Sequence, residues 1–282
     1  MKSQLIWPWL EGILDSDDAK VMKVDFPEML VMHERVLLLP KINRNKSEVL
    51  NLLGEIYKIH HQTTQDINGL HQAICLYDDA IRDGVDDNPI YFNDLGMSLA
   101  AWFQQQGDLG DMNKSILTFE YAVQLTPDGH PDKPSLLNNL GSGLLSRFER
   151  LGDLGDMNES VLMKEHAVKL TPDGHPDKPS RLNNLGNSLL SRFGRLGDLG
   201  DINKSVLMFE HAVQLTLDGH PDKPSLLNNL GSGLLSRFER LGDLGDMNES
   251  VLMFEHAVQL TPDGHPDKPS QLNNFGSMVM VM

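Results

Sequence analysis

The residues best suited to chemistry lie in a short acidic loop that occurs four times. Asp128, His130 and Asp132 form the first copy, and the same Asp-Gly-His-Pro-Asp string begins again at positions 173, 218 and 263. Carboxylates and imidazoles bind metals and carry protons. However, the spacing is too tight for helical histidine pairs, no calcium-loop pattern follows, and Asp, Gly and Pro are residues that turns require. We therefore expect structural turns, with no metal and no cofactor.

Cys75 is the only cysteine of the chain. It lies between Ile74 and Leu76 in a helical pattern, which favours a buried apolar side chain over a nucleophile. A single cysteine also excludes an intramolecular disulfide framework and a multi-cysteine zinc site, and it suggests a reducing compartment such as the cytoplasm. Because no glycine-rich phosphate loop occurs either, we expect a protein that is not an enzyme.

The charge balance argues against two classes of partner. The net charge is −16, whereas phosphate binding and anionic membrane surfaces both require clustered Lys and Arg. No stretch approaches the ~18 apolar residues of a membrane span. We therefore expect neither nucleic acid nor membrane as a partner.

Two strings reveal an internal repeat of 45 residues. The string GDLGD begins at Gly107 and again at positions 152, 197 and 242, and the string DGHPDKPS recurs with the same period. Residues 135–179 and 225–269 differ only at Lys164/Phe254 and Lys169/Gln259. A fixed period of this length predicts a tandem array in place of a single large core.

Each repeat predicts two helices. Apolar residues in steps of three and four indicate a first helix over 135–150. Gly152 suits its C-terminus, where a left-handed backbone is needed. A second helix over about 157–170 is expected to begin with Asp156 as N-cap and Glu159 as its capping-box partner.

These hairpins resemble tetratricopeptide repeats. The pattern reads Leu50-x-x-Leu53-Gly54-x-x-Tyr57 in the first unit, and in all five complete units a small residue follows the marker glycine by 19 residues. The chain is similar to kinesin-light-chain-like repeats and to the arrays of fungal CHAT-domain proteins, although no CHAT domain is present. The resemblance implies an all-α, right-handed α-solenoid of antiparallel helix hairpins.

The expected units are 48–89, 90–134, 135–179, 180–224 and 225–269, with a half unit at 270–282. Residues 1–47 match no unit, and they are expected to form an irregular cap or a disordered leader. The final apolar run Met278–Met282 has no partner helix, which suggests a fragment of a longer protein or an end-to-end homodimer. The oligomeric state stays open.

The resemblance also implies a concave groove lined by the first helices. The residues carried over to the groove share the polar side of these helices: Asn138, Ser142, Arg147, Asn183, Asn187, Arg192, Asn228, Ser232, Arg237 and Asn273, with Asn93, Asp94 and Ser98 before them and Ser277 after them. An asparagine amide offers one acceptor and two donors, so such a row could hold an extended peptide by its backbone. We therefore expect a protein-binding scaffold whose partner is a protein or peptide.

Alternatives stay open for these rows. Asn139, Asn184 and Asn229 could satisfy local backbone groups between repeats. The Arg row could meet acidic groups of a partner or pair with Asp and Glu of neighbouring turns. For the whole chain, the alternative to a scaffold is a non-catalytic structural or sensor segment of a larger assembly, or a truncated duplicate without its effector domain.

Lys164 stands where the other units carry Phe or Tyr. We expect its stem to lie in the core and its ammonium group at the edge. The unit 135–179 should then be the least stable part of the array. Lys164→Phe should stabilise the array by ~1 kcal/mol or more.

Overall fold

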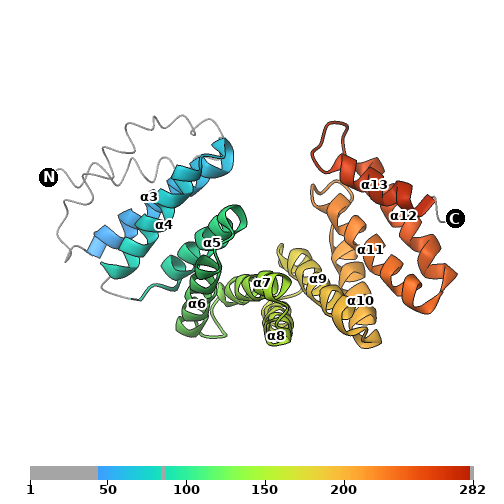
Figure 1. Ribbon diagram of the computed structural model, residues 1–282, viewed down its shortest axis with the longest axis horizontal. Coiled ribbons are helices and arrows are strands. Elements are labelled where there is room, and N and C mark those ends of the chain that lie inside the picture. The colour runs from blue at the N-terminus through green and yellow to red at the C-terminus, as the bar shows by residue number, and fades with distance from the viewer. Residues whose placement is uncertain (1–43, 84–86, 280–282) are drawn as a thin grey trace. The chain divides into compact units, whose positions relative to one another are not determined.

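The computed structural model describes residues 44–83 and 87–279, and every regular element in these ranges is an α-helix (Figure 1). In chain order the helices are α3 (Arg44–Thr64), α4 (Ile67–Arg82), α5 (Pro89–Gln106), α6 (Leu109–Leu125), α7 (Lys133–Leu151), α8 (Leu154–Leu170), α9 (Lys178–Leu196), α10 (Leu199–Leu215), α11 (Lys223–Leu241), α12 (Leu244–Leu260) and α13 (Lys268–Val279). None of these helices is long and apolar enough to cross a membrane. The expected all-α class and the succession of paired hairpins are confirmed.

The GDLGD string is the connection inside a hairpin. Gly152 closes α7 in a left-handed conformation, with φ 74°, and donates its N–H to the carbonyl of Phe148. Asp153 follows at once and caps α8, because its Oδ1 accepts the N–H of Gly155 at 2.8 Å. Two residues therefore suffice to reverse the chain, and the equivalent Gly-Asp pairs do the same before α6, α10 and α12.

The expected capping by Asp156 is wrong. The helix α8 begins at Leu154, three residues earlier than expected, because Asp153 lies nearer to the turn and binds the free N–H of its first turn. Asp156 lies inside that turn and its carboxylate is paired elsewhere. The capping box with Glu159 depended on the Asp156 cap and is wrong for the same reason.

The chain divides between Pro127 and Asp128 into two compact units. The first holds the hairpins α3/α4 and α5/α6, and Leu50, Tyr57 and Tyr77 are fully buried in its core. The second holds the hairpins α7/α8, α9/α10 and α11/α12, followed by α13. Its core continues from one hairpin to the next, as the cluster of Leu182, Ala212 and Leu226 on three successive helices shows.

The constant 19-residue interval has a physical cause in four of the five described hairpins. Ser205 Oγ donates to the carbonyl oxygen of the marker glycine Gly186 at 2.8 Å. The ring of Phe209, four residues further on, covers the same glycine so closely that a Cβ there would come within 2.5 Å of the ring. A marker glycine is therefore required for the two helices to approach. The same serine bond recurs in three other hairpins, from Ser115 to Gly96, from Ser160 to Gly141 and from Ser250 to Gly231.

The expectations for residues 1–47 and for the run Met278–Met282 fall almost wholly outside the described residues, as does the Ser277 side chain. They stay predictions, as do the unit bounds.

Candidate functional site

The groove residues expected from Asn138 to Asn273 occupy equivalent positions on the first helices of the hairpins in the second compact unit. Those on α7, α9 and α11 are half-buried, and Asn273 on α13 is exposed. Three of them, Asn138, Asn183 and Asn228, are spaced by one repeat. All of these side chains therefore have some access to solvent, as a binding face requires.

The asparagines form a ladder of side-chain hydrogen bonds between successive first helices. Asn184 Nδ2 donates to Asn138 Oδ1 at 3.1 Å, and Asn229 Nδ2 donates to Asn183 Oδ1 at 2.9 Å. The third rung joins Asn274 to Asn228, also at 2.9 Å. We call these three pairs the asparagine ladder. Each rung lies between neighbouring hairpins, so the ladder helps to fix the spacing of one repeat from the next.

The ladder corrects one alternative reading of the sequence. The bonds of Asn184 and Asn229 join side chain to side chain across repeats, and do not serve local backbone groups. Because the Oδ1 atoms of Asn138, Asn183 and Asn228 are already bonded, the orientation of each amide is fixed. No described residue accepts from the Nδ2 of these three asparagines, so their N–H donors are left to solvent or to a ligand.

The first unit contains one variant rung. Asn51 Nδ2 donates to Asp94 Oδ2 at 3.3 Å, across α3 and α5. Burial raises the pKa of Asp94, although Lys58 and the amide of Asn51 oppose this effect. The expectation that Ser98 faces the groove is wrong, because Ser98 is 1% exposed and its Oγ has no hydrogen-bond partner among the described residues.

The serine positions beside the ladder bond to their own helix. Ser142 Oγ donates to the carbonyl of Asn138 at 3.0 Å, and Ser232 Oγ donates to that of Asn228 at 2.9 Å. Asn187 occupies the same position on α9. These side chains border the ladder. A serine hydroxyl there could bind a ligand by giving up only its bond to a carbonyl of its own helix.

The arginine row closes the hairpins. Arg147 Nε and Nη2 both donate to the carboxylate of Asp156 at 2.7 Å, and Arg192 binds Asp201 in the same bidentate manner. Arg237 repeats the arrangement with Asp246. This hydrogen bond is the main reason why the pKa values of Arg192 and Arg237 are raised. The pairing with acids of neighbouring turns is thus present, and a partner would have to compete with a bidentate ion pair.

The histidine loops are built as turns. In the loop before α9, His175 Nδ1 accepts the N–H of Asp177 at 3.1 Å, and the other three loops show the same bond. Within the described residues, no three His, Cys, Asp or Glu side chains lie close enough to hold a metal ion. The imidazole ring therefore has a structural role in each loop.

The lysines of the three loops within the second compact unit cap the preceding helices, a function not expected from the sequence. Lys178 Nζ donates to the carbonyls of Val168 and Thr171, at 3.0 and 2.8 Å, at the C-terminus of α8. Lys223 and Lys268 do the same for α10 and α12. A cation is favoured at this end of a helix by its dipole. The recurrence of Lys one residue before the helix-initiating proline was the available signal.

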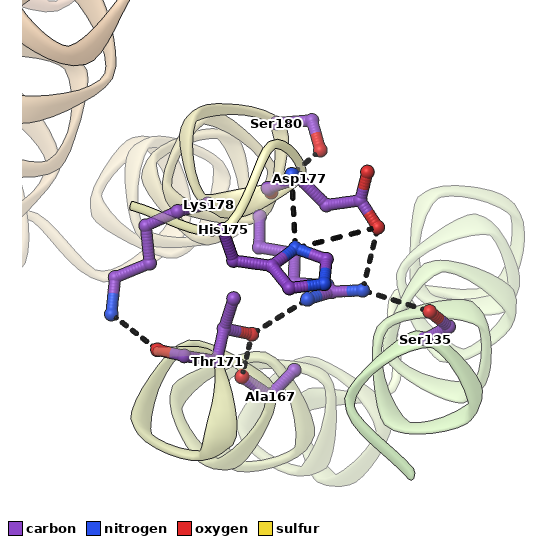
Figure 2. A network of polar contacts seen from close by, with 8 residues as sticks. Ser135, Ala167, Thr171, His175, Asp177, Lys178 and Ser180 are labelled. Atoms are coloured by element: carbon purple, nitrogen blue, oxygen red, sulfur yellow. Dashed lines mark hydrogen bonds and ion pairs between the residues drawn. The ribbon is translucent and has the colours of Figure 1, made fainter. Parts of the chain in front are cut away.

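A buried arginine ties the same loop to two helices (Figure 2). Arg181, 5% exposed, donates to Thr171 Oγ1, Ser135 Oγ and Asp177 Oδ2 at 2.8 to 2.9 Å. Figure 2 shows that these partners, Ser135, Thr171 and Asp177, lie on different segments of the chain. Burial lowers the pKa of Arg181, and Asp177 opposes that shift.

Cys75 is exposed, which corrects the expectation of a buried side chain. Its Sγ lies 4.0 Å from His71 Nδ1. Partial burial, followed by the charges of Asp79 and Asp78, raises the pKa of the thiol. The reactive thiolate is therefore disfavoured at neutral pH.

The comparisons with known proteins agree with this architecture. The BtubC protein of P. vanneervenii superposes with a TM-score of 0.58 at 17% identity, covering 86% of this chain and 91% of that one. A thermophilic TPR protein of Thermus thermophilus gives a TM-score of 0.53 at 15% identity, covering 83% and 99%. A Podospora anserina protein described as a putative kinesin light chain with nearly identical TPR-like repeats gives 0.53 at 14% identity, covering 78% and 96%.

No family model and no curated protein matches the sequence. At these identities the likeness shows the fold alone. The chain therefore has the tetratricopeptide-repeat fold. The kinesin-light-chain-like repeats of the compared structure have the same fold. The similarity to CHAT-domain arrays stays a prediction.

Proposed function

We propose that the protein is a binding scaffold whose asparagine ladder holds the backbone of an extended protein or peptide segment. The observation that carries this proposal is the row of Nδ2 groups on Asn138, Asn183 and Asn228. Each amide is oriented by a bond to its Oδ1, and its donors have no acceptor among the described residues. A row of oriented amide donors can bind carbonyl oxygens of an extended chain.

The charge of the face supports a neutral partner segment. The arginines of the row are each paired with a bidentate aspartate, and the asparagine and serine side chains of the row carry no charge. Recognition through backbone carbonyls needs no charge complementarity. The overall charge of −16 also disfavours a strongly acidic partner and nucleic acid.

Affinity capture with matched variants tests the proposal. Native protein, the triple variant Asn138→Ala/Asn183→Ala/Asn228→Ala and the control Leu162→Ala/Leu207→Ala/Leu252→Ala are used as parallel baits, with mass spectrometry of the bound proteins. The control residues occupy equivalent positions on the second helices and are 58, 44 and 57% exposed. We expect the partner to be lost by the asparagine variant and kept by the leucine variant.

Two outcomes would contradict the proposal. Retention of the partner by a folded asparagine variant would exclude the ladder as the binding site. Loss of the partner only in the leucine variant would assign binding to the exposed face of the second helices. Circular dichroism of both variants establishes that each remains helical.

A further inference from the structure

One joint between successive hairpins of the second unit is polar where the next joint is apolar. Between α10 and α11, the ring of Phe209 lies against Gly233, and a Cβ added there would come within 3.1 Å of the ring. At the same place between α8 and α9 stand Lys164, 2% exposed, and Ser188, which is fully buried. A cationic side chain therefore replaces an aromatic one inside the array.

Lys164 is stretched across the joint. Its stem covers the marker glycine Gly141, as expected for this position. The expectation that its ammonium group lies at the edge of the core is wrong, because Nζ is buried and donates to Ser188 Oγ at 2.9 Å. Ser188 Oγ lies 3.2 Å from Ser160 Oγ, whose own proton is donated to Gly141. Among the described residues, Ser188 is the single acceptor for an ammonium group with three N–H donors.

The surrounding charges compensate Lys164 only weakly. Burial lowers the pKa of Lys164 to about 8, and Glu149 on α7 opposes this without reversing it. Glu165, the next residue on α8, is already paired with Lys204 on α10 at 2.5 Å. A second buried cation, Arg181 of α9, also lies at this joint. The equivalent residue of α11 is Leu226. The joint thus buries two cationic side chains.

Opening of this joint is linked to proton binding. In an open joint the amine of Lys164 returns to water, where its ordinary pKa is 10.5. Between the closed and open pKa values the open state binds more protons, so closing becomes more favourable as the pH rises through that interval. Below the closed pKa the amine is charged in both states, and the penalty for closing is constant.

We propose that the α8/α9 joint is a pH-sensitive hinge, which opens more readily when Lys164 is protonated and closes when its neutral amine packs against Ser188. The Asn184–Asn138 rung spans the same joint, whereas the Asn229–Asn183 rung spans the apolar one. Opening therefore separates one rung of the asparagine ladder and leaves the next rung in place. This behaviour is a property of the chain alone and does not depend on a bound partner.

Hydrogen exchange followed by mass spectrometry tests the hinge on the intact chain. The exchange rate of backbone amides in α8 and α9 is divided by that in α10 and α11 of the same molecule at each pH. This ratio cancels the intrinsic pH dependence of exchange. We expect the ratio to be nearly constant well below pH ~8 and to fall about fortyfold between pH ~8 and ~10, with a steepest slope approaching tenfold for each pH unit.

The double variant Lys164→Phe/Ser188→Gly is the matched control, because it copies the Phe209–Gly233 pair that the chain already contains. The ratio should be independent of pH in this variant, and also in Lys164→Met. A ratio independent of pH in the native chain would overturn the proposal. So would an undiminished pH dependence in the double variant, because another group would then be responsible.

Discussion

In four hairpins, a serine 19 residues after the marker glycine joins the two helices by a single buried hydrogen bond. The first hairpin has Ala73 at the same position. The interval itself could be recognised in the sequence because repeats make it visible. Its meaning could not, because the carbonyl that accepts the bond lies on another helix.

We expect Ser205→Ala to destabilise the second unit by about 1 kcal/mol, since a buried carbonyl loses a hydrogen bond. The converse change, Ala73→Ser, should stabilise the first unit by a similar amount if the new hydroxyl reaches Gly54. Chemical denaturation of each variant measures both effects. No change in the denaturation midpoint on Ser205→Ala would show that the bond contributes nothing to stability.

Lys164 shows how far a single position can be predicted. The sequence indicates a core position from the aromatic residues of the other repeats, and that is correct. The acceptor for its ammonium group is Ser188, 24 residues away on the next hairpin, and it stands where α7 and α11 have glycine. Because the two residues differ together from the Phe209–Gly233 pair, the expected gain from Lys164→Phe alone needs revision.

We now expect Lys164→Phe alone to be opposed by crowding against Ser188, which costs about 1–3 kcal/mol in a packed core. Adding Ser188→Gly should relieve it, so that the double variant is more stable than the native chain by up to about 3 kcal/mol at neutral pH. This advantage should shrink as the pH rises above ~8, because the native lysine then loses its charge. Thermal unfolding at several pH values measures it, and a gain from the single variant equal to that of the double would contradict the coupling.

The sequence predicts well that each helix exists and which helix it pairs with. It predicts the termini of the helices less well. The left-handed Gly152 was predictable because its conformation is local. The N-cap of α8 was misassigned because the GDLGD string contains two aspartates with different roles. Asp153 caps the helix, and Asp156 binds Arg147, nine residues back on the other helix of the hairpin. Only the tertiary pairing distinguishes them.

Because only some hairpins contain the arginine–aspartate pair, we expect the same substitution at two equivalent aspartates to change stability by different amounts. Asp201→Asn should destabilise its hairpin by about 1–2 kcal/mol, since a bidentate charge-assisted bond to Arg192 is lost. Asp111→Asn is the control, because Trp102 stands in the arginine position of that hairpin, and its effect should lie within about 0.5 kcal/mol. Equal effects of the two substitutions in urea denaturation would show that the ion pair does not hold the hairpin.

In the molecule as a whole, the repeat places the same weak contact, one asparagine amide donor, at regular intervals along the chain. A single amide donor contributes about 1 kcal/mol to a complex, and identical rungs at one-repeat spacing can add their contributions along an extended partner. The row positions were predictable from the period of 45 residues. The ladder that orients them was not, because each rung joins residues 46 apart on different hairpins.

The most direct measurement of the central claim is the NMR spectrum of the asparagine side-chain amides, recorded before and after addition of the captured partner. We predict that the Nδ2 signals of Asn138, Asn183 and Asn228 shift, because their donors take new acceptors. The signals of Asn203 and Asn248, which are exposed on the second helices, should remain in place. Shifts of Asn203 and Asn248 with an unchanged ladder row would contradict the account.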